Sequence, residues 1–262
     1  MNLNFSGKTA IVCGSSQGIG KCTALELAKN GANLVLVARN EEKLKAVLAE
    51  LPQDSTQKHQ YLVADFSHPE EVRKAVETYL ENGGDCHILV NNTGGPKGGN
   101  IIDAKPEEFV LAFNQHLVCN HILVQHLVPL MKKNGYGRIV NVISTSVKQP
   151  LNGLGVSNTI RGAVANWSKT LANELGQFNI TVNNVLPGST NTVRLQSIAE
   201  NKSGKSGKTV DAIFDEMAEI VPMKRIAEPE EIANAIVFLA SEAASYINGI
   251  NVPVDGGRTK SL

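Results

Sequence analysis

The sequence predicts an α/β fold built on a doubly wound parallel sheet of about seven strands with helices on both faces. Seven short runs are almost wholly apolar, as strands buried on both faces of a sheet are. Segments with the period of amphipathic helices alternate with these runs, and this order is typical of parallel sheets with crossover helices. No repeat or linker divides the 262 residues, so we expect residues 1–262 to form one domain.

Each element is predicted from its local pattern. The apolar runs are four to seven residues long, a length that suits strands. They place strands at residues 8–13, 33–38, 61–64, 87–90, 138–143, 180–186 and 250–254. Helical periodicity places helices at residues 20–30, 41–50, 69–81, 106–133, 156–176 and 229–240.

One long excursion, residues 189–228, departs from this alternation. It contains the polar, basic and glycine-rich residues 201–208, followed by a short amphipathic stretch near residues 209–221. A long excursion in a compact domain is often a binding loop or lid, so we expect a substrate lid here; a solvated loop is the alternative. A phosphate-binding P-loop is not expected, because the Lys-Ser pairs lack a preceding strand and the full spacing.

Composition excludes several classes of function. Lys plus Arg (25) balance Asp plus Glu (25), and nucleic-acid binding would need a basic excess. No apolar run reaches membrane-spanning length and no signal peptide is visible, so no membrane partner and a cytoplasmic location are expected. The four cysteines form no C-x-x-C pair, which favours reduced thiols over disulfides or zinc. Nor is a metal site expected from histidines five residues apart around one helix, at His116, His121 and His126.

A glycine-rich turn follows the first predicted strand and opens the first predicted helix. Its glycines are spaced G-x-x-x-G-x-G, and glycines let a backbone turn tightly and approach a pyrophosphate. The helix N-terminus adds free N–H groups and a partial positive charge. The pattern therefore predicts a Rossmann-type dinucleotide site, although purely structural glycines are the alternative. Its residues are Gly14, Ser15, Ser16, Gln17, Gly18, Ile19 and Gly20.

The end of the second predicted strand bears on the choice of dinucleotide. An acidic residue there would accept hydrogen bonds from the adenosine ribose and favour NAD. This chain has Ala38, Arg39 and Asn40 instead. Arg39 can pair with a 2′-phosphate, so NADP(H) is the expected cofactor, unless Arg39 is an ordinary surface residue.

Together with the glycine turn, residues 65–66, 91–94, 187–192 and 254–257 resemble motifs of the short-chain dehydrogenase/reductase family. The resemblance covers roughly residues 5–257. It implies contacts to adenine from the first motif, to a ribose from the second, and to the nicotinamide amide and phosphate from the third. The further cofactor-binding residues that it implies are Asp65, Phe66, Asn92, Gly94, Arg161, Pro187, Gly188, Thr190 and Thr192.

The resemblance breaks down at the reactive centre. The catalytic serine of the family corresponds to Ser144, but its Asn, Tyr and Lys correspond to His116, Ser157 and Arg161. Asn114 lies two residues before His116, so a small shift in alignment would restore the asparagine; unbroken spacing to the rest of the helix favours His116. The candidate catalytic residues are therefore Ser144, His116, Ser157 and Arg161.

These replacements change the available chemistry. In the family, the Tyr protonates the carbonyl oxygen and the Lys lowers its pKa. The Ser157 hydroxyl is far less acidic than a phenol, whereas Arg161, with an ordinary pKa of about 12.5–13.8, stays protonated and can hold a ribose or an oxyanion. His116, with an ordinary pKa of about 6.5, is the best remaining proton donor. The structural alternatives are a buried, satisfied His116 and relics of lost catalysis at Ser157 and Arg161. Tyr61 and Tyr136 lie at or before predicted strand starts, away from the carboxyl ends.

Such a centre favours a reaction that needs no strong acid. Hydride addition to an isolated ketone makes a strongly basic alkoxide, whereas addition to a conjugated C=C makes an enolate that fixed donors can stabilise. We therefore expect an NADPH-dependent oxidoreductase that reduces an activated carbonyl or conjugated double bond of a small molecule. Residues 222–225, 244–249 and 260–261 are similar to a subgroup that lacks the usual Tyr and includes bacilysin-pathway reductases; the chain also resembles 3-oxoacyl-carrier-protein reductases. The alternatives are a non-catalytic NADP(H)-binding sensor, and a lyase or epimerase.

Members of the family usually assemble, so a homodimer or homotetramer is expected. The long predicted helices at residues 106–133 and 156–176 suit an interface, with Trp167 as an anchor. Burial within the monomer would explain the same apolar stripes.

Overall fold

Seven parallel strands form the central sheet of the computed structural model, which describes residues 3–261. The strand order is β3-β2-β1-β4-β5-β6-β7, and every neighbouring pair is parallel. The predicted doubly wound sheet is therefore confirmed. The strands are β1 (Thr9–Cys13), β2 (Asn33–Ala38), β3 (His59–Val63), β4 (Ile88–Asn91), β5 (Gly137–Val142), β6 (Ile180–Pro187) and β7 (Asn251–Val254).

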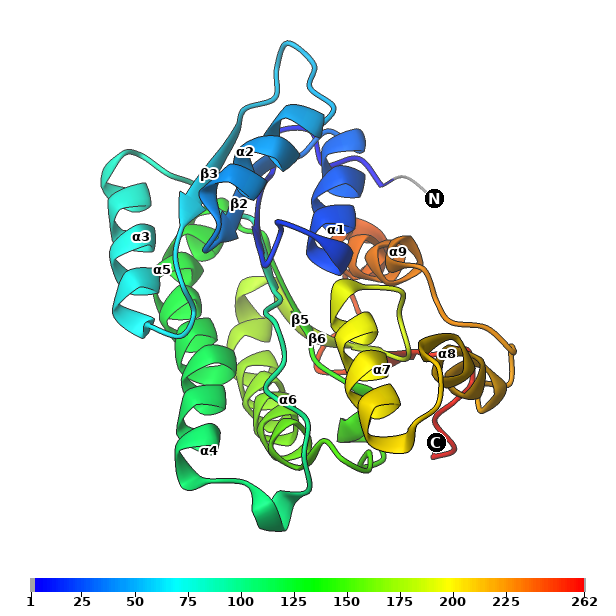
Figure 1. Ribbon diagram of the computed structural model, residues 1–262. Helices are drawn as coiled ribbons and strands as arrows, with labels where there is room; N and C mark the ends of the chain where they lie inside the picture. Colours follow the sequence, from blue (N-terminus) through cyan, green and yellow to red (C-terminus); the bar gives the residue numbers. More distant parts are fainter. Residues whose placement is uncertain (1–2, 262) are drawn as a thin grey trace.

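Helices cover both faces of the sheet (Figure 1). The α-helices are α1 (Gly18–Lys29), α2 (Glu41–Glu50), α3 (Pro69–Glu81), α4 (Pro106–Phe113), α5 (Cys119–Asn134), α6 (Gly155–Leu175), α7 (Val193–Ser206), α8 (Val210–Glu219) and α9 (Pro229–Ala240). A π-helical turn, η2 (Asn114–Val118), joins α4 to α5, and short 3₁₀ turns are η1 (Ile101–Asp103), η3 (Thr145–Val147), η4 (Gly176–Phe178) and η5 (Glu242–Ala244). Within residues 3–261, no helix combines the length and apolarity needed to cross a membrane.

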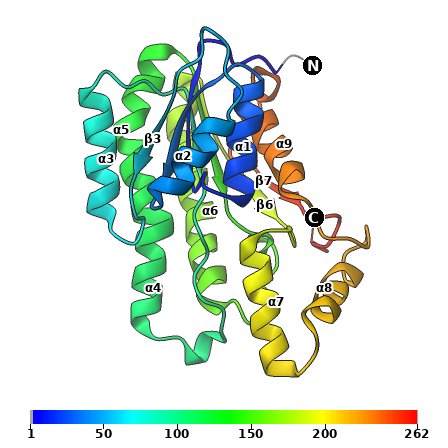
Figure 2. The same cartoon turned by 45° about the horizontal axis from the view of Figure 1, so that its top comes forward.

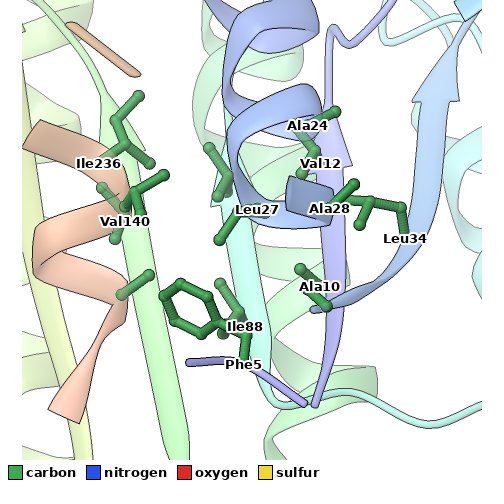
Figure 3. Packing of buried hydrophobic residues seen from close by; sticks show 14 of the residues in the cluster. Phe5, Ala10, Val12, Ala24, Leu27, Ala28, Leu34, Ile88, Val140 and Ile236 are labelled. Atoms are coloured by element: carbon green, nitrogen blue, oxygen red, sulfur yellow. The ribbon is translucent and has the colours of Figure 1, made fainter. Parts of the chain in front are cut away.

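Each face of the sheet has its own apolar core. On one face, α1, α2 and α9 contribute to a cluster with the strands; on the other, α3, α5 and α6 do so. Figure 3 shows the first core, with Leu27 and Ala28 of α1 near Leu34 of β2, and Ile236 of α9 near Val140 of β5. All four cysteines are free thiols, and three of them are buried.

The sheet order changes direction between β1 and β4. From β1 the chain first builds β2 and β3 on one side, then crosses to β4 and the remaining strands on the other. In open α/β sheets, ligands bind beyond the carboxyl ends of the strands at such a switch point. Here that point lies just beyond Cys13 of β1 and Asn91 of β4.

A ladder of asparagine side chains crosses four neighbouring strands. Asn91 donates to Asn141 (2.8 Å), Asn141 donates to Asn184 (3.0 Å), and Asn184 donates to Asn251 (2.8 Å). Asn141 also donates to Ser168 Oγ of α6 at 2.9 Å. Each asparagine is the register partner of the next along the sheet. Because the first three are buried and a slipped strand would leave their amides unpaired, the ladder fixes the strand register.

The third strand begins earlier than its apolar run predicted. It starts at His59 rather than residue 61, and His59 pairs in register with Leu34 of β2. The His59 Nδ1 atom accepts a hydrogen bond from Leu34 N at 3.1 Å. Because β3 is an edge strand, its polar first residues satisfy the ladder without being buried on both faces.

The excursion at residues 189–228 is more ordered than its polar composition predicted. Residues up to Ser206 belong to α7, and only the next three separate it from α8. Thr192 caps α7 by accepting a hydrogen bond from Leu195 N, and Gly207, in the left-handed region with φ 71°, ends it. Leu195 and Ala199 of α7 pack against Ile213 and Met217 of α8. Figure 2 shows this pair of helices lying away from the sheet, with α7 near α6.

Candidate active site

The glycine-rich turn lies at the switch point, pressed against the loop after β4. Gly14 and Gly18 have φ values of 61° and 55°, which favour glycine. A Cβ on Gly14 would lie 2.5 Å from Asn92 O, and a Cβ on Gly20 would lie 2.3 Å from Gly14 O. Asn92 Nδ2 in turn donates to Cys13 O (3.3 Å) and Gly14 O (3.4 Å). A side chain is therefore excluded at Gly14 and Gly20, where only glycine fits.

The first turn of α1 keeps its amide groups available for a ligand. Its N-cap residue, Gln17, makes no side-chain capping bond, unlike Asn40, Thr192 and Thr209, which cap α2, α7 and α8. Uncapped N–H groups at a helix start form an anion site. Ser15 does not contribute its hydroxyl, because this is buried and accepts from Val37 N of β2 at 3.0 Å. Ser16 and Ile19 are half-buried within the turn.

Two cations flank this turn on the side of β2. The Arg39 side chain is 75% exposed, and its Nη1 lies 3.8 Å from Asp65 Oδ2, so little holds it in place. Lys43, in the first turn of α2, donates from Nζ to Gln17 Oε1 at 3.1 Å. The sequence points to Arg39 as a phosphate ligand. It does not point to Lys43, which is marked only by its place in the first turn of a predicted helix. Both can reach a ligand phosphate beside the turn.

Three of the other predicted cofactor residues lie in the loops that follow β3 and β4. Asp65 and Phe66 follow β3, but the Phe66 side chain is buried in the core and its carbonyl accepts from Cys119 Sγ. Only the backbone of Phe66 can therefore face a nucleotide. Gly94 is exposed, and a Cβ there would meet nothing within 4 Å. Its glycine identity is not required by packing.

The segment after β6 reaches back to the glycine turn. Pro187 ends β6, and a Cβ on Gly188 would lie 2.8 Å from Asp255 Cα, which explains the glycine. Thr190 is buried and donates to Gly188 O at 3.2 Å. A Cβ on Gly18 would lie 3.3 Å from Thr192 Cγ2. The start of α7 therefore lies against the turn that opens α1.

His116 lies in the π-helical turn, a local widening that often marks a functional site. Its side chain is 1% exposed; Nδ1 lies 2.6 Å from Thr93 Oγ1, and Nε2 has no hydrogen-bond partner among residues 3–261. Burial, helped by the charges of Arg161 and Arg194, holds the pKa of His116 well below its ordinary value. This lowered pKa favours the neutral imidazole at neutral pH, so the role of His116 as proton donor stays a prediction.

Ser144 and Arg161 lie at the carboxyl end of β5, and Ser157 lies one turn before Arg161 on α6. Ser144 caps η3 by accepting from Ser146 N at 3.1 Å, which leaves its proton free to be donated. Ser157 and Arg161 lie one turn apart on α6, which packs against η3 and the π-helical turn of His116. Arg161 is buried and donates from Nη1 to Val142 O at 3.0 Å. Burial, with a smaller effect of Arg194, lowers the pKa of Arg161 to about 10, so it remains charged at neutral pH.

The four tyrosines all lie elsewhere. The Tyr61 hydroxyl donates to Glu41, Tyr79 donates to Asp85 O, and Tyr136 donates to Ala240 O. Tyr246 is fully exposed between η5 and β7. The sequence predicts Tyr61 at the start of its strand, but it lies in the middle of β3. None of the four tyrosines lies beyond the carboxyl ends of β4 and β5. No phenol is therefore available beside Ser144.

A cavity of about 270 Å³ lies between the loop after β4, the start of α6 and the end of α7. The segment after β4, the start of α6 and the end of α7 line it through Lys97, Asn100, Val156 and Lys205. Its lining includes none of the candidate catalytic residues; Val156, which lines it, directly precedes Ser157 on α6.

Comparisons with known proteins agree with this geometry. The family model for enoyl-(acyl carrier protein) reductases matches residues 14–259. The chain is 32% identical to the NADPH-dependent reductase BacG of Bacillus subtilis (strain 168), covering 98% of this chain and 100% of BacG. Among solved structures, it is similar to L-sorbose reductase from Gluconobacter frateurii complexed with NADPH and L-sorbose (TM-score 0.93, 35% identity, 100% of both chains). It is also similar to YwfH, an NADPH-dependent reductase involved in bacilysin biosynthesis (TM-score 0.91, 32% identity, 98% of this chain and 100% of that one).

Proposed function

The chain belongs to the short-chain dehydrogenase/reductase family, and from this premise we propose that it is an NADPH-dependent reductase whose reactive centre works without a tyrosine. Its substrate is a small molecule with a conjugated double bond or an activated carbonyl. The observation that carries this proposal is the pair of donors at the end of β5, Ser144 and Arg161, with all four tyrosines elsewhere. Ser157, one turn before Arg161 on α6, is the third proposed donor.

NADP(H) fits the part of the site formed by the glycine turn and the start of α1. The glycine turn leaves backbone in place of side chains, and the uncapped start of α1 supplies amides for the pyrophosphate. Arg39 and Lys43 would hold the 2′-phosphate, while Asn92 and Thr192 lie on the side of the turn nearer the reactive centre. When bound, NADPH supplies a hydride for the reduction.

The residues of the chain then have to stabilise negative charge on the substrate oxygen. Arg161 stays charged, and the Ser144 and Ser157 hydroxyls are available as neutral donors, so the group resembles an oxyanion hole. A neutral His116 contributes a hydrogen bond rather than a proton. These donors suit an enolate, which takes its proton from water, better than the alkoxide of an isolated ketone.

A matched pair of neutral substrates tests this function. We expect the protein to oxidise NADPH with 3-penten-2-one and to release 2-pentanone, identified by NMR. The kcat/KM for 2-pentanone itself should be at least ~100-fold lower, because a general acid contributes about 10²–10⁴-fold to such a step. Equal reduction of both ketones would overturn the proposal. NADPH binding without turnover of any conjugated substrate would instead favour the non-catalytic sensor.

The cofactor preference is expected to depend on Arg39. Arg39→Asp should weaken NADPH binding by about 10–100-fold, the loss expected for charge-assisted hydrogen bonds, and should strengthen NADH binding. Calorimetric titration of both cofactors measures the change. Arg73→Asp, on the exposed surface of α3, alters net charge equally and should leave both affinities unchanged. A parallel loss of NADPH and NADH affinity in Arg39→Asp would contradict a role at the 2′-phosphate.

Self-association is also proposed. Val110, Leu111 and Phe113 of α4 are 61%, 47% and 41% exposed, and such apolar surface supports a homodimer or homotetramer.

A further inference from the structure

Arg194 joins α7, a helix of the proposed lid at residues 189–228, to the loop that follows β4. It is the second residue of α7, and its Nη2 donates to Pro96 O. A Cβ built on Gly95 would lie 3.5 Å from Arg194 Nη2 and 3.8 Å from its Cζ, so the guanidinium packs over the backbone of Gly95. The same loop carries Thr93, which holds His116. Arg194 therefore reaches from the lid to the residues that surround the reactive centre.

Neither Arg194 nor Arg161 has a carboxylate partner. Within residues 3–261, no Asp or Glu oxygen lies within 4.0 Å of either guanidinium. Four of the other five arginines lie within that distance of an acidic side chain in the described part of the chain, and only Arg258, near the C-terminus, does not. The four are Arg39, Arg73, Arg138 and Arg225. Arg161 is buried and Arg194 is half-buried. A charge removed from water without a partner is costly, which favours an anion as the missing partner.

His116 supplies a third unpaired group. Its Nε2 is buried without a partner, while Nδ1 lies against Thr93 Oγ1. If the threonine hydroxyl donates to Nδ1, the proton of the neutral ring is on Nε2, which becomes a donor without an acceptor. Burial is the main cause of the lowered pKa values of His116 and Arg161, and the positive charge of Arg194 adds to both.

We propose that the substrate is an anion whose carboxylate is bound by Arg194, beside Arg161 and His116. The inference rests on the reductase function proposed above and specifies its substrate class. A guanidinium offers a planar fork of donors that matches a carboxylate in two parallel hydrogen bonds. Because Arg194 belongs to the lid, binding of the carboxylate would also hold α7 against the loop after β4.

A pair of substrates that differ only in charge tests the proposal. The wild-type protein should reduce 4-oxo-2-pentenoate with a kcat/KM well above that of its methyl ester. Arg194→Gln should lower kcat/KM for the acid by about 100-fold and for the ester by less than about 3-fold, because it removes a charge-assisted bidentate contact. Arg194→Lys should retain part of the preference. Lys202→Gln, at an exposed position on the same helix, is the matched control.

Binding measurements separate this proposal from the reductase function. Calorimetry on the NADP⁺-loaded protein should detect pentanoate but not methyl pentanoate, and Arg194→Gln should abolish the difference, whether or not any enone is reduced. Equal losses for acid and ester would overturn the proposal. So would an Arg194→Gln protein that loses NADPH affinity by the same factor, since Arg194 would then contact a cofactor phosphate. Failure to reduce either enone, with pentanoate binding intact, would count against the reductase function alone.

Discussion

Replacing Asn141 with leucine is expected to destabilise the protein by about 3–6 kcal/mol. Leucine has nearly the same shape but removes all three hydrogen bonds that Asn141 makes, to Asn91, Asn184 and Ser168. Each orphaned buried polar group costs about 1–3 kcal/mol. Asn91 would lose its only side-chain partner, because its Oδ1 is already unpaired. Against a typical total stability of about 5–15 kcal/mol, such a loss is severe.

Urea unfolding at a fixed protomer concentration measures this effect, with the midpoint and slope determined separately. Asn251→Ala is the matched control, because Asn251 ends the ladder on the half-exposed edge strand, where water can replace the lost contact. It should cost about 1 kcal/mol or less. A cost below about 1 kcal/mol for Asn141→Leu would mean that the ladder is incidental to stability.

The ladder was not foreseen from the sequence, although its members are visible there. Each asparagine interrupts an apolar run, and a buried strand tolerates an amide only if neighbours satisfy it. The signal that they form one network is their common register, and register depends on how the strands pair. Strand positions, by contrast, follow from local apolarity, and all seven were predicted to within about two residues. Five of the seven are buried on both faces, and the two edge strands, β3 and β7, are not.

For α7, in contrast to the strands, the local sequence pattern predicts the wrong structure. Residues 201–208 are polar and contain two glycines, which argues locally for a loop. Tertiary contacts decide otherwise, since Leu195 and Ala199 gain an apolar partner only when α8 folds back on them. Predictions based on period fail where the helix has just two buried positions.

Some parts of the candidate site can be predicted from local sequence and others cannot. The glycine turn can, because only glycine tolerates such tight turns and close contacts, and these contacts account for Gly14 and Gly20. The charge states of buried side chains cannot be read from the sequence in this way. The ordinary pKa of His116 suggests a proton donor, whereas burial, helped by two nearby arginines, lowers that pKa and favours the neutral ring. Arg194, distant in sequence from the other groups, acquires meaning only when α7 brings it to the loop after β4.

Replacing Gly20 with alanine is expected to remove NADPH binding. The added Cβ would lie 2.3 Å from Gly14 O, 2.7 Å from Gly14 C and 2.8 Å from Asn92 Nδ2. Two of these atoms are backbone, so the helix start must move away from the turn. Overpacking of this kind costs about 1–3 kcal/mol even before the amides of α1 are displaced from the phosphate, so the dissociation constant should rise by about 100-fold or more.

Titration with NADPH, alongside thermal unfolding, separates lost binding from lost folding. Gly204→Ala provides the control: Gly204 is exposed in α7, and a Cβ there meets nothing within 4 Å. It should gain about 0.5–1 kcal/mol of stability with NADPH affinity unchanged. A folded Gly20→Ala protein that binds NADPH within about 3-fold of wild type would show that the dinucleotide does not lie on this turn. In that case the close approach of Gly20 to Gly14 would serve packing alone, and the anion site at Arg194 would have to be considered without a cofactor beside it.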